Sequence, residues 1–242
     1  MSTSSKRTRQ SRCACSKSDA AAQPFPKSGP LWKNMNLELA NLQPSKLPDG
    51  KVFAYVLSTV EVDKDRFVQY GSAPNFQGGL ITLCTCMRHH RTWWDSWKGV
   101  WVAGLCGKNI KNGNQLFYLM HVTYEAESHF ELWYSPIMRA SREAKSAQHD
   151  VFGDLFEPKS SCAKGRFDPD NYVRPVKGHR HEKDNKWHAD INYIYGKRRP
   201  KLLVGDPAHS YLWEEPKCSF TGKRHPRFKV YQSLQEFLNR LQ

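Results

Sequence analysis

Residues 100–124 read VWVAGLCGKNIKNGNQLFYLMHVTY, two apolar runs separated by a polar segment that contains glycine. The runs 100–105 and 116–124 are rich in β-branched and aromatic side chains, which favours buried strands. Asn112-Gly113 between them is a turn signal typical of hairpins. The segment therefore predicts two buried strands joined as a hairpin.

Similar runs lie on both sides of this hairpin, at residues 52–57, 80–84 and 202–205, and residues 211–213 extend the last strand or pair with another. Ser128 is a predicted N-cap for a short amphipathic helix, and the apolar spacing over residues 234–241 predicts a second helix at the C-terminal end. Strands and helices do not alternate strictly, which argues against a doubly wound sheet. We expect an α+β domain built on a small, strongly curved mixed or antiparallel sheet or a barrel, with two or three short helices.

The domain organisation follows from composition. Residues 1–46 are rich in Ser, Lys, Ala, Gln and Pro and predict a disordered basic arm, with a segment at residues 31–42 that could dock. Residues 47–220 form the expected globular domain, and residues 221–242 a basic link followed by the C-terminal helix. Residues 31–42 and the C-terminal helix are the two candidate surfaces for a protein partner.

The charge balance favours a polyanionic partner. The chain of 242 residues has 37 Lys and Arg against 23 Asp and Glu, a net charge of +14, of which the first 47 residues carry +6. A nucleic acid, with DNA foremost, or a nucleotide is the expected partner. No apolar run suits a transmembrane helix or a secretion signal, so the sequence predicts no membrane partner and a cytoplasmic or nuclear location.

Residues 70–86, YGSAPNFQGGLITLCTC, resemble the signature of the nucleotide modification associated domain 2 family, in which a Tyr-Gly…Ala-Pro-Asn loop leads into a Thr-Leu-x-x-Cys strand. Later segments match that family's landmarks in order, at residues 100–104, 119–123, 130–133, 153–156 and 202–206. The resemblance spans about residues 51–213. It implies a role beside enzymes that modify or process nucleic-acid bases, and the strand layout more faintly resembles PUA-like barrels that hold modified bases.

The chain departs from the family pattern in three places. Gly99 stands where the family has an acid, Leu155 replaces an Asn, and Pro207-Ala208 lengthens the segment before His209. If any of these positions touches the ligand, the function here is altered.

The candidate base- or nucleotide-binding residues combine aromatic faces for stacking with cations for phosphates and polar groups for base edges. They are Tyr70, Asn75, Arg88, Arg91, Trp93, Trp94, Asp154 and Trp187. We expect Tyr70, Asn75, Asp154 and one of the two adjacent tryptophans to line one concave site. The alternative is that most of the aromatic rings are core and that Asn75 bonds its own backbone.

Three functions remain open on the sequence alone. The first is a recognition module for a nucleotide or modified base in nucleic-acid modification or defence. The second is a base- or nucleotide-processing hydrolase or transferase that uses Asp154, His188 and Asp206. The third is a protein-binding scaffold. The sequence lacks phosphate-loop, dinucleotide-binding, serine-hydrolase and zinc-deaminase motifs. Its Cys-x-Cys pairs do not have the usual zinc-ligand spacing, and no predicted helix or strand fixes the geometry of His179-x-His181 with Asp190. It therefore predicts no cofactor and no metal.

Overall fold

The computed structural model describes residues 22–108, 113–146, 153–175, 186–221 and 224–242. Its strands join in one seven-stranded sheet with the order β2-β1-β4-β5-β6-β3, and β7 also pairs with β1. The strands are β1 Val52–Asp63, β2 Arg66–Gln69, β3 Thr82–Leu83, β4 Trp101–Lys108, β5 Gln115–Ala126, β6 Leu202–Leu212 and β7 Phe228–Tyr231. The β1–β4 pair is parallel and every other pair is antiparallel.

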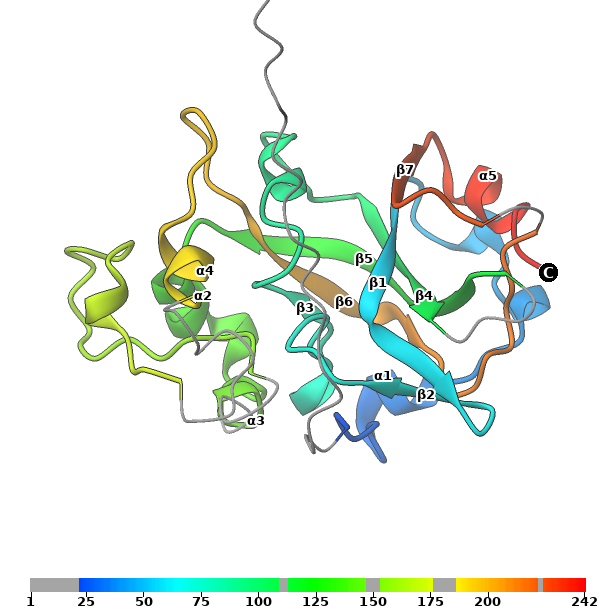
Figure 1. Ribbon diagram of the computed structural model, residues 1–242, viewed down its shortest axis with the longest axis horizontal. Helices are drawn as coiled ribbons and strands as arrows, with labels where there is room; N and C mark the ends of the chain where they lie inside the picture. Colours follow the sequence, from blue (N-terminus) through cyan, green and yellow to red (C-terminus); the bar gives the residue numbers. More distant parts are fainter. Residues whose placement is uncertain (1–21, 109–112, 147–152, 176–185, 222–223) are drawn as a thin grey trace, which may run out of the picture.

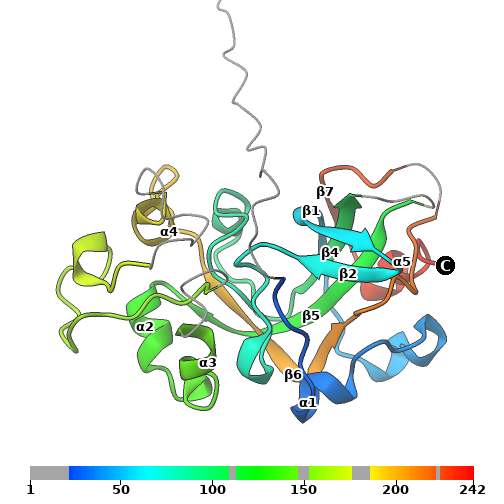
Figure 2. The same cartoon turned by 60° about the horizontal axis from the view of Figure 1, so that its bottom comes forward.

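The sheet curls strongly into a half-barrel, and short helices cover its ends (Figure 1). The described residues contain five α-helices: α1 Gly29–Lys33, α2 His129–Tyr134, α3 Arg142–Ser146, α4 His188–Asn192 and α5 Leu234–Leu238. Figure 2 shows α2, α3 and α4 gathered on one side and α5 at the opposite end. The predicted α+β class with a small curved mixed sheet is confirmed.

The predicted hairpin is present as β4 and β5, which pair from Trp101↔His121 to Cys106↔Gln115. Both strands are almost wholly buried because their apolar side chains face the core on both sides of the sheet. The helix start at Ser128 is also confirmed, since its side chain accepts a hydrogen bond from the N–H of Glu131 at 3.1 Å.

Two strands were missed by sequence pattern. β2 follows β1 through Lys64 and Asp65, whose φ angles of 46° and 61° match the tight turn that joins two antiparallel strands. Lysine is not a typical residue for this conformation, so the turn left little signal. β7 lies in the segment assigned to the basic link, where Lys229 interrupts an otherwise apolar run.

The described part of the predicted arm, residues 22–46, packs against the sheet. Leu31 in α1 and Leu42 are buried in the main core, and Asn36 N donates to the carbonyl of Leu212 in β6. In α5, Phe237 is also fully buried. The apolar side chains that suggested docking surfaces in both segments thus contact this chain's own core.

Among the described residues, no helix is both long and apolar enough to cross a membrane.

Candidate functional site

The loop between β2 and β3 comes unusually close to β1. A Cβ atom at Gly71 would lie 2.5 Å from Thr59 Oγ1, so this approach requires glycine. Further along the loop, the hydroxyls of Ser72 and Thr85 are 3.1 Å apart in a hydrogen bond. The segment with the strongest family signature therefore fixes Thr59 and Thr85, which both line a cleft described below.

Behind this loop lies a buried polar group, here called the interior cluster, made of Asn75, Thr82, Lys145 and Asp154. Lys145 enters from α3, and its Nζ donates to Asn75 O and Oδ1 at 2.9 Å each and to Leu80 O at 2.8 Å. Burial lowers the pKa of Lys145 to about 8, against the opposing effect of Asp154. The ammonium thus holds the loop from the inside.

Asp154 completes the interior cluster. It is fully buried, and its Oδ2 accepts a hydrogen bond from Thr82 Oγ1 at 2.8 Å. Burial raises the pKa of Asp154, while the Lys145 ammonium and the Thr82 hydroxyl act in the opposite direction. The structure therefore brings together two predicted base-reading residues, Asn75 and Asp154, but places them in the protein interior.

Arg91 is also fully buried, and its guanidinium is engaged by the backbone. Nε donates to Cys86 O at 2.8 Å, Nη2 to Cys84 O at 2.7 Å, and Nη1 to the carbonyl of Lys201. Burial lowers its pKa, an effect that the neighbouring Cys84 and Asp190 oppose. Arg91 thus ties the β3 loop to the start of β6.

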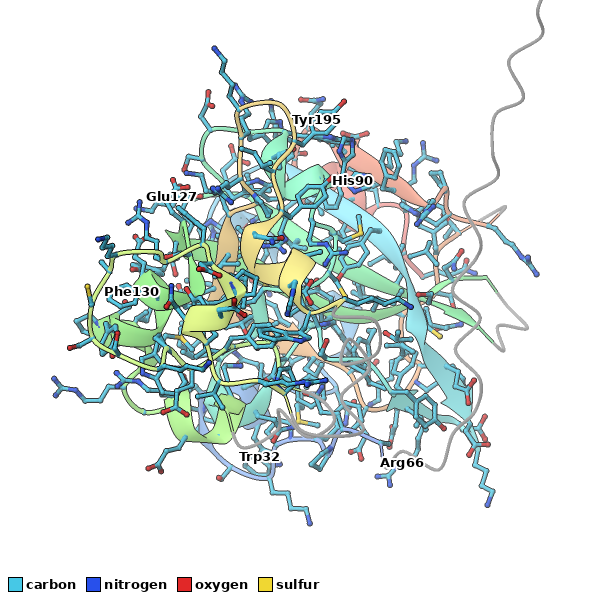
Figure 3. The ribbon with its side chains drawn as sticks, turned by 60° about the vertical axis from the view of Figure 1, so that its left-hand side comes forward. Trp32, Arg66, His90, Glu127, Phe130 and Tyr195 are labelled. Carbon is cyan, nitrogen blue, oxygen red and sulfur yellow. The ribbon has the colours of Figure 1, made fainter. Side chains whose placement is uncertain are left out.

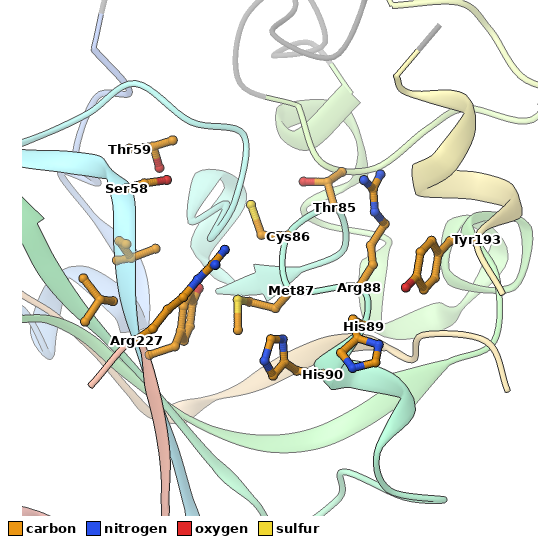
Figure 4. A pocket seen from close by; sticks show the side chains of 13 residues that line it. Ser58, Thr59, Thr85, Cys86, Met87, Arg88, His89, His90, Tyr193 and Arg227 are labelled. Carbon is orange, nitrogen blue, oxygen red and sulfur yellow. The ribbon is translucent and has the colours of Figure 1, made fainter. Parts of the chain in front are cut away.

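A cleft of about 510 Å³ opens between β1 and residues 85–90 (Figure 4). Its size falls within the range of roughly 300–1,000 Å³ that is usual for ligand pockets. The lining residues are Tyr55, Val56, Leu57, Ser58, Thr59, Thr85, Cys86, Met87, Arg88, His89, His90, Tyr193 and Arg227. None of them is acidic.

Two arginines of the cleft differ in how they are paired. Arg88 bonds the buried carboxylate of Asp190 at 2.5 Å, and its guanidinium lies 5.7 Å from the ring centre of Tyr193. Arg227 is exposed, and its guanidinium has no ion pair or hydrogen bond with any residue that the structure describes. Figure 4 shows Arg227 on the opposite wall from Tyr193. The cleft therefore presents an unneutralised cation across from an aromatic ring.

Aromatic rings build the rim of the cleft. The ring of His89 packs edge-on against Tyr195 with centroids 4.4 Å apart, and His90 lies 4.4 Å from Phe228 and 4.6 Å from Trp93. His90 and Tyr195 lie on the same side of the molecule (Figure 3). Trp93 thus supports the rim from behind and does not line the cleft.

Two titratable groups of the cleft, His90 and Cys86, are held in neutral forms. Burial, then His89 and Arg227, lower the pKa of His90 to about 4, so its ring is uncharged at pH 7. Burial and Asp190 raise the pKa of the Cys86 thiol to about 11. A nucleophilic cysteine needs a lowered pKa, so Cys86 is not activated.

The other predicted binding residues lie around the cleft or away from it. Tyr70 is half-buried, and its N–H donates to Thr59 O at 2.9 Å, behind the cleft wall. Trp94 packs against Trp97, with ring centroids 4.5 Å apart. Trp187 is 4% exposed and belongs to a separate apolar cluster with Phe156.

The three candidate catalytic residues occupy different places in the described structure. Asp154 is in the interior cluster. His188 borders a second hollow beside Trp187, together with Lys159. Asp206 accepts a hydrogen bond from His209 on β6. The described contacts therefore do not join them into one acid–base set.

Of the thirteen residues that line the cleft, only Arg88 was among the predicted binding residues. The residues that were missed include Ser58, Thr59, Tyr193 and Arg227. Ser58 and Thr59 lie on the polar continuation of β1, beyond the apolar run that marked the strand. Arg227 is far away in the sequence and reaches the cleft because β7 pairs with β1. Tyr193 directly follows α4 and lies beside Arg88, which was itself a predicted binding residue.

The comparisons with known proteins agree with the sequence resemblance. The family model described as nucleotide modification associated domain 2 matches residues 50–195, more than half of the chain. No curated protein and no solved structure matches. The matched range holds the loop, the interior cluster and every cleft residue except Arg227. The chain belongs to the nucleotide modification associated domain 2 family.

Proposed function

We propose that this chain is a recognition module that binds a nucleotide or modified base in the cleft, within a process that modifies nucleic acid or defends against foreign DNA. The observation that carries the proposal is the unpaired Arg227 guanidinium on the wall opposite the Tyr193 ring. A nucleotide offers the matching pair of groups, an anionic phosphate and a flat base.

The phosphate end of the proposed site is formed by Arg227 with the hydroxyls of Ser58 and Thr59. An arginine fork matches phosphate oxygens in geometry, and hydrogen bonds between charged groups are the strong ones. Because no acidic side chain lines the cleft among the described residues, nothing there competes for this guanidinium.

The base end is formed by Tyr193 and the adjacent histidine rings. Arg88 lies over Tyr193 and is fixed in turn by the buried Asp190, so the aromatic face is oriented before a ligand arrives. Stacking on such a face contributes about 1–3 kcal/mol per base. The neutral His90 offers one hydrogen-bond donor and one acceptor for a base edge.

Recognition fits these groups better than covalent chemistry. Cys86 remains a thiol at pH 7, and His90 has too low a pKa to act as a general acid there. The family membership supports association with nucleotide modification, and the chemical step is assigned in this proposal to another protein.

The test is a titration of the full chain with a fluorescently labelled single-stranded DNA oligonucleotide, with unlabelled nucleoside 5′-monophosphates as competitors. Arg227→Ala is expected to weaken binding of both by about 10-fold or more, because a hydrogen bond to a charged group contributes about 1.5–3 kcal/mol. Competitors with methylated or hydroxymethylated bases then rank the preference for modification.

The matched control is Arg224→Ala, which removes the same charge from an exposed residue outside the cleft. It is expected to bind within about twofold of the unmodified chain. Both variants lose one positive charge, so any nonspecific electrostatic effect on affinity is the same in both, and a larger loss in Arg227→Ala comes from the cleft. Equal affinity of the Arg227→Ala and Arg224→Ala variants would rule out the cleft as the phosphate site.

A further inference from the structure

A second group of chemically active side chains lies where β5 and β6 lose their regular pairing. Met120 pairs with Ser210 and Val122 pairs with Gly205, so residues 206–209 of β6 lie opposite the single residue His121. Bulges of this kind re-aim side chains and often accompany functional sites. The bulge contains Pro207-Ala208, the pair that lengthens this segment beyond the family pattern.

The bulge brings His121, Asp206 and His209 together. One potential ligand atom of each lies within 4.8 Å of those of the other two. His209 Nδ1 and Asp206 Oδ2 are 2.7 Å apart. His121 is only 9% exposed, and neither of its ring nitrogens has a hydrogen-bond partner among the described residues. A buried imidazole without such a partner is costly unless another group satisfies it.

The surrounding structure holds this arrangement in place. Asn34, from the N-terminal segment, donates through Nδ2 to the carbonyls of Pro207, Ala208 and Ser210 at 3.2–3.3 Å. The N–H of Ala208 donates to Asp206 Oδ1 at 2.9 Å. The Asn34 amide and the Ala208 N–H thus hold the bulge in place, as a preorganised ligand site requires.

We propose that His121, Asp206 and His209 bind a divalent transition-metal ion, with Zn²⁺ as the preferred ion. Two imidazoles and one carboxylate are a common donor set for zinc and for related first-row metals. Metal–ligand bonds of about 2.0–2.2 Å place tetrahedral ligand atoms about 3.3 Å apart. The three ligand atoms here lie within 4.8 Å of one another, so side-chain shifts of about 1 Å bring them to that separation. Three protein ligands leave the fourth position to water or a ligand atom.

This site departs from the sequence-based expectation of no metal, and it is separate from the proposed nucleotide site. None of the three residues lines the cleft. The pattern was hidden because His121 is far from Asp206 and His209 in the sequence. The proposed metal site therefore does not depend on whether the cleft binds a nucleotide.

The test uses the full chain, treated with chelator and then titrated with Zn²⁺ by calorimetry, with Mg²⁺ as a comparison ion. We expect one Zn²⁺ per chain and no measurable binding of Mg²⁺, which favours oxygen ligands. His121→Asn and His209→Gln are each expected to lower zinc affinity by at least about 100-fold, more than the 10- to 100-fold typical of residues that only support a ligand. His209 is partly exposed, so the second variant remains informative if the first does not fold.

The matched control is the double variant His179→Ala/His181→Ala, which removes a histidine pair outside the described residues. It is expected to retain full zinc affinity. Retained affinity in the His209→Gln variant, or loss in the double variant, would overturn the proposal. Co²⁺ provides an independent readout, since a thiolate charge-transfer band would assign the metal to cysteines and would also overturn it.

Discussion

The interior cluster and the cleft lie on two sides of the same loop. Each contains a cationic side chain, Lys145 in the interior and Arg227 in the cleft, but among the described contacts only Lys145 is hydrogen-bonded by the chain. In the interior, the Lys145 ammonium makes three hydrogen bonds and interacts with the buried Asp154. In the cleft, Arg227 is exposed and its guanidinium has no partner among the described residues. The comparison teaches that a charge satisfied inside the protein shapes a site, whereas a charge left open to solvent is available for a ligand.

The largest expected effect comes from breaking the interior cluster. Lys145→Met leaves the Asp154 carboxylate buried without its cation and removes three hydrogen bonds to Asn75 and Leu80, which is expected to cost about 3–5 kcal/mol of folding free energy. Urea denaturation measures this loss. Lys98→Met, at an exposed lysine, is the matched control and should change stability by less than about 0.5 kcal/mol. If the two variants were equally stable, the cluster would not be structural.

A smaller loss is expected at Arg88, which joins the cleft to Asp190 in α4. Arg88→Ala removes the 2.5 Å ion pair to the buried Asp190 carboxylate. Because Arg88 is partly exposed and water can replace part of the interaction, we expect a cost of about 2 kcal/mol. The Arg88→Ala/Asp190→Ala double variant should lose less than the two single losses combined, in a thermodynamic cycle based on denaturation. If the two losses simply added, Arg88 and Asp190 would not stabilise the fold through a direct interaction.

Lowering the pH should reduce the folding stability through another buried group, His129 in α2. Burial is the main cause that lowers its pKa from 6.5 to about 3, although Asp190 opposes the shift. The unfolded chain therefore binds a proton below pH 6.5 that the folded chain does not, and stability falls as the pH drops from 6.5 towards 3. By pH 5 this contribution reaches about 2 kcal/mol.

His129→Asn is the variant that isolates this effect, because an amide oxygen can still accept the hydrogen bond that His129 Nδ1 takes from the N–H of Phe156. Denaturation curves at pH 7 and pH 5 should differ less for this variant than for the unmodified chain. The same pH-dependence in both proteins would mean that His129 is protonated in the fold.

The smallest expected effect concerns salt. Oligonucleotide affinity should fall as salt rises, with a log–log slope of about −0.7 per phosphate contact for a single strand. Arg227→Ala should reduce the magnitude of the slope by about one contact, or about 0.7, and Arg224→Ala should leave it unchanged. Anisotropy titrations between 50 and 200 mM salt, about the range over which such slopes are resolved, measure it. A slope unaffected by Arg227→Ala would show that this side chain does not bind phosphate.

Local patterns predicted much of the fold. The apolar runs of β4 and β5, the cap at Ser128 and the family signature at residues 70–86 are each encoded within a few neighbouring residues. The site depends instead on contacts between distant segments. Arg227 reaches the cleft through the β1–β7 pairing, and Lys145 reaches Asn75 through the docking of α3. No local pattern reports either contact.

The predicted roles of Asn75, Arg91 and Asp154 illustrate the same limit. Their residue types suit a base or a phosphate, but the sequence does not show that each is fully buried. Inside the protein their polar groups bond the chain itself, and the loop that they hold forms the back of the cleft. Under the proposed function, the signature residues position the site, and Tyr193 and Arg227 contact the ligand.

The most direct test of this account is a crystal structure of the full chain with a nucleoside 5′-monophosphate. The account predicts the phosphate within hydrogen-bond distance of the Arg227 guanidinium, the base against the Tyr193 ring, and the interior cluster unchanged. A nucleotide bound instead against Asn75 and Asp154, or in the hollow beside Trp187, with the cleft empty, would contradict it.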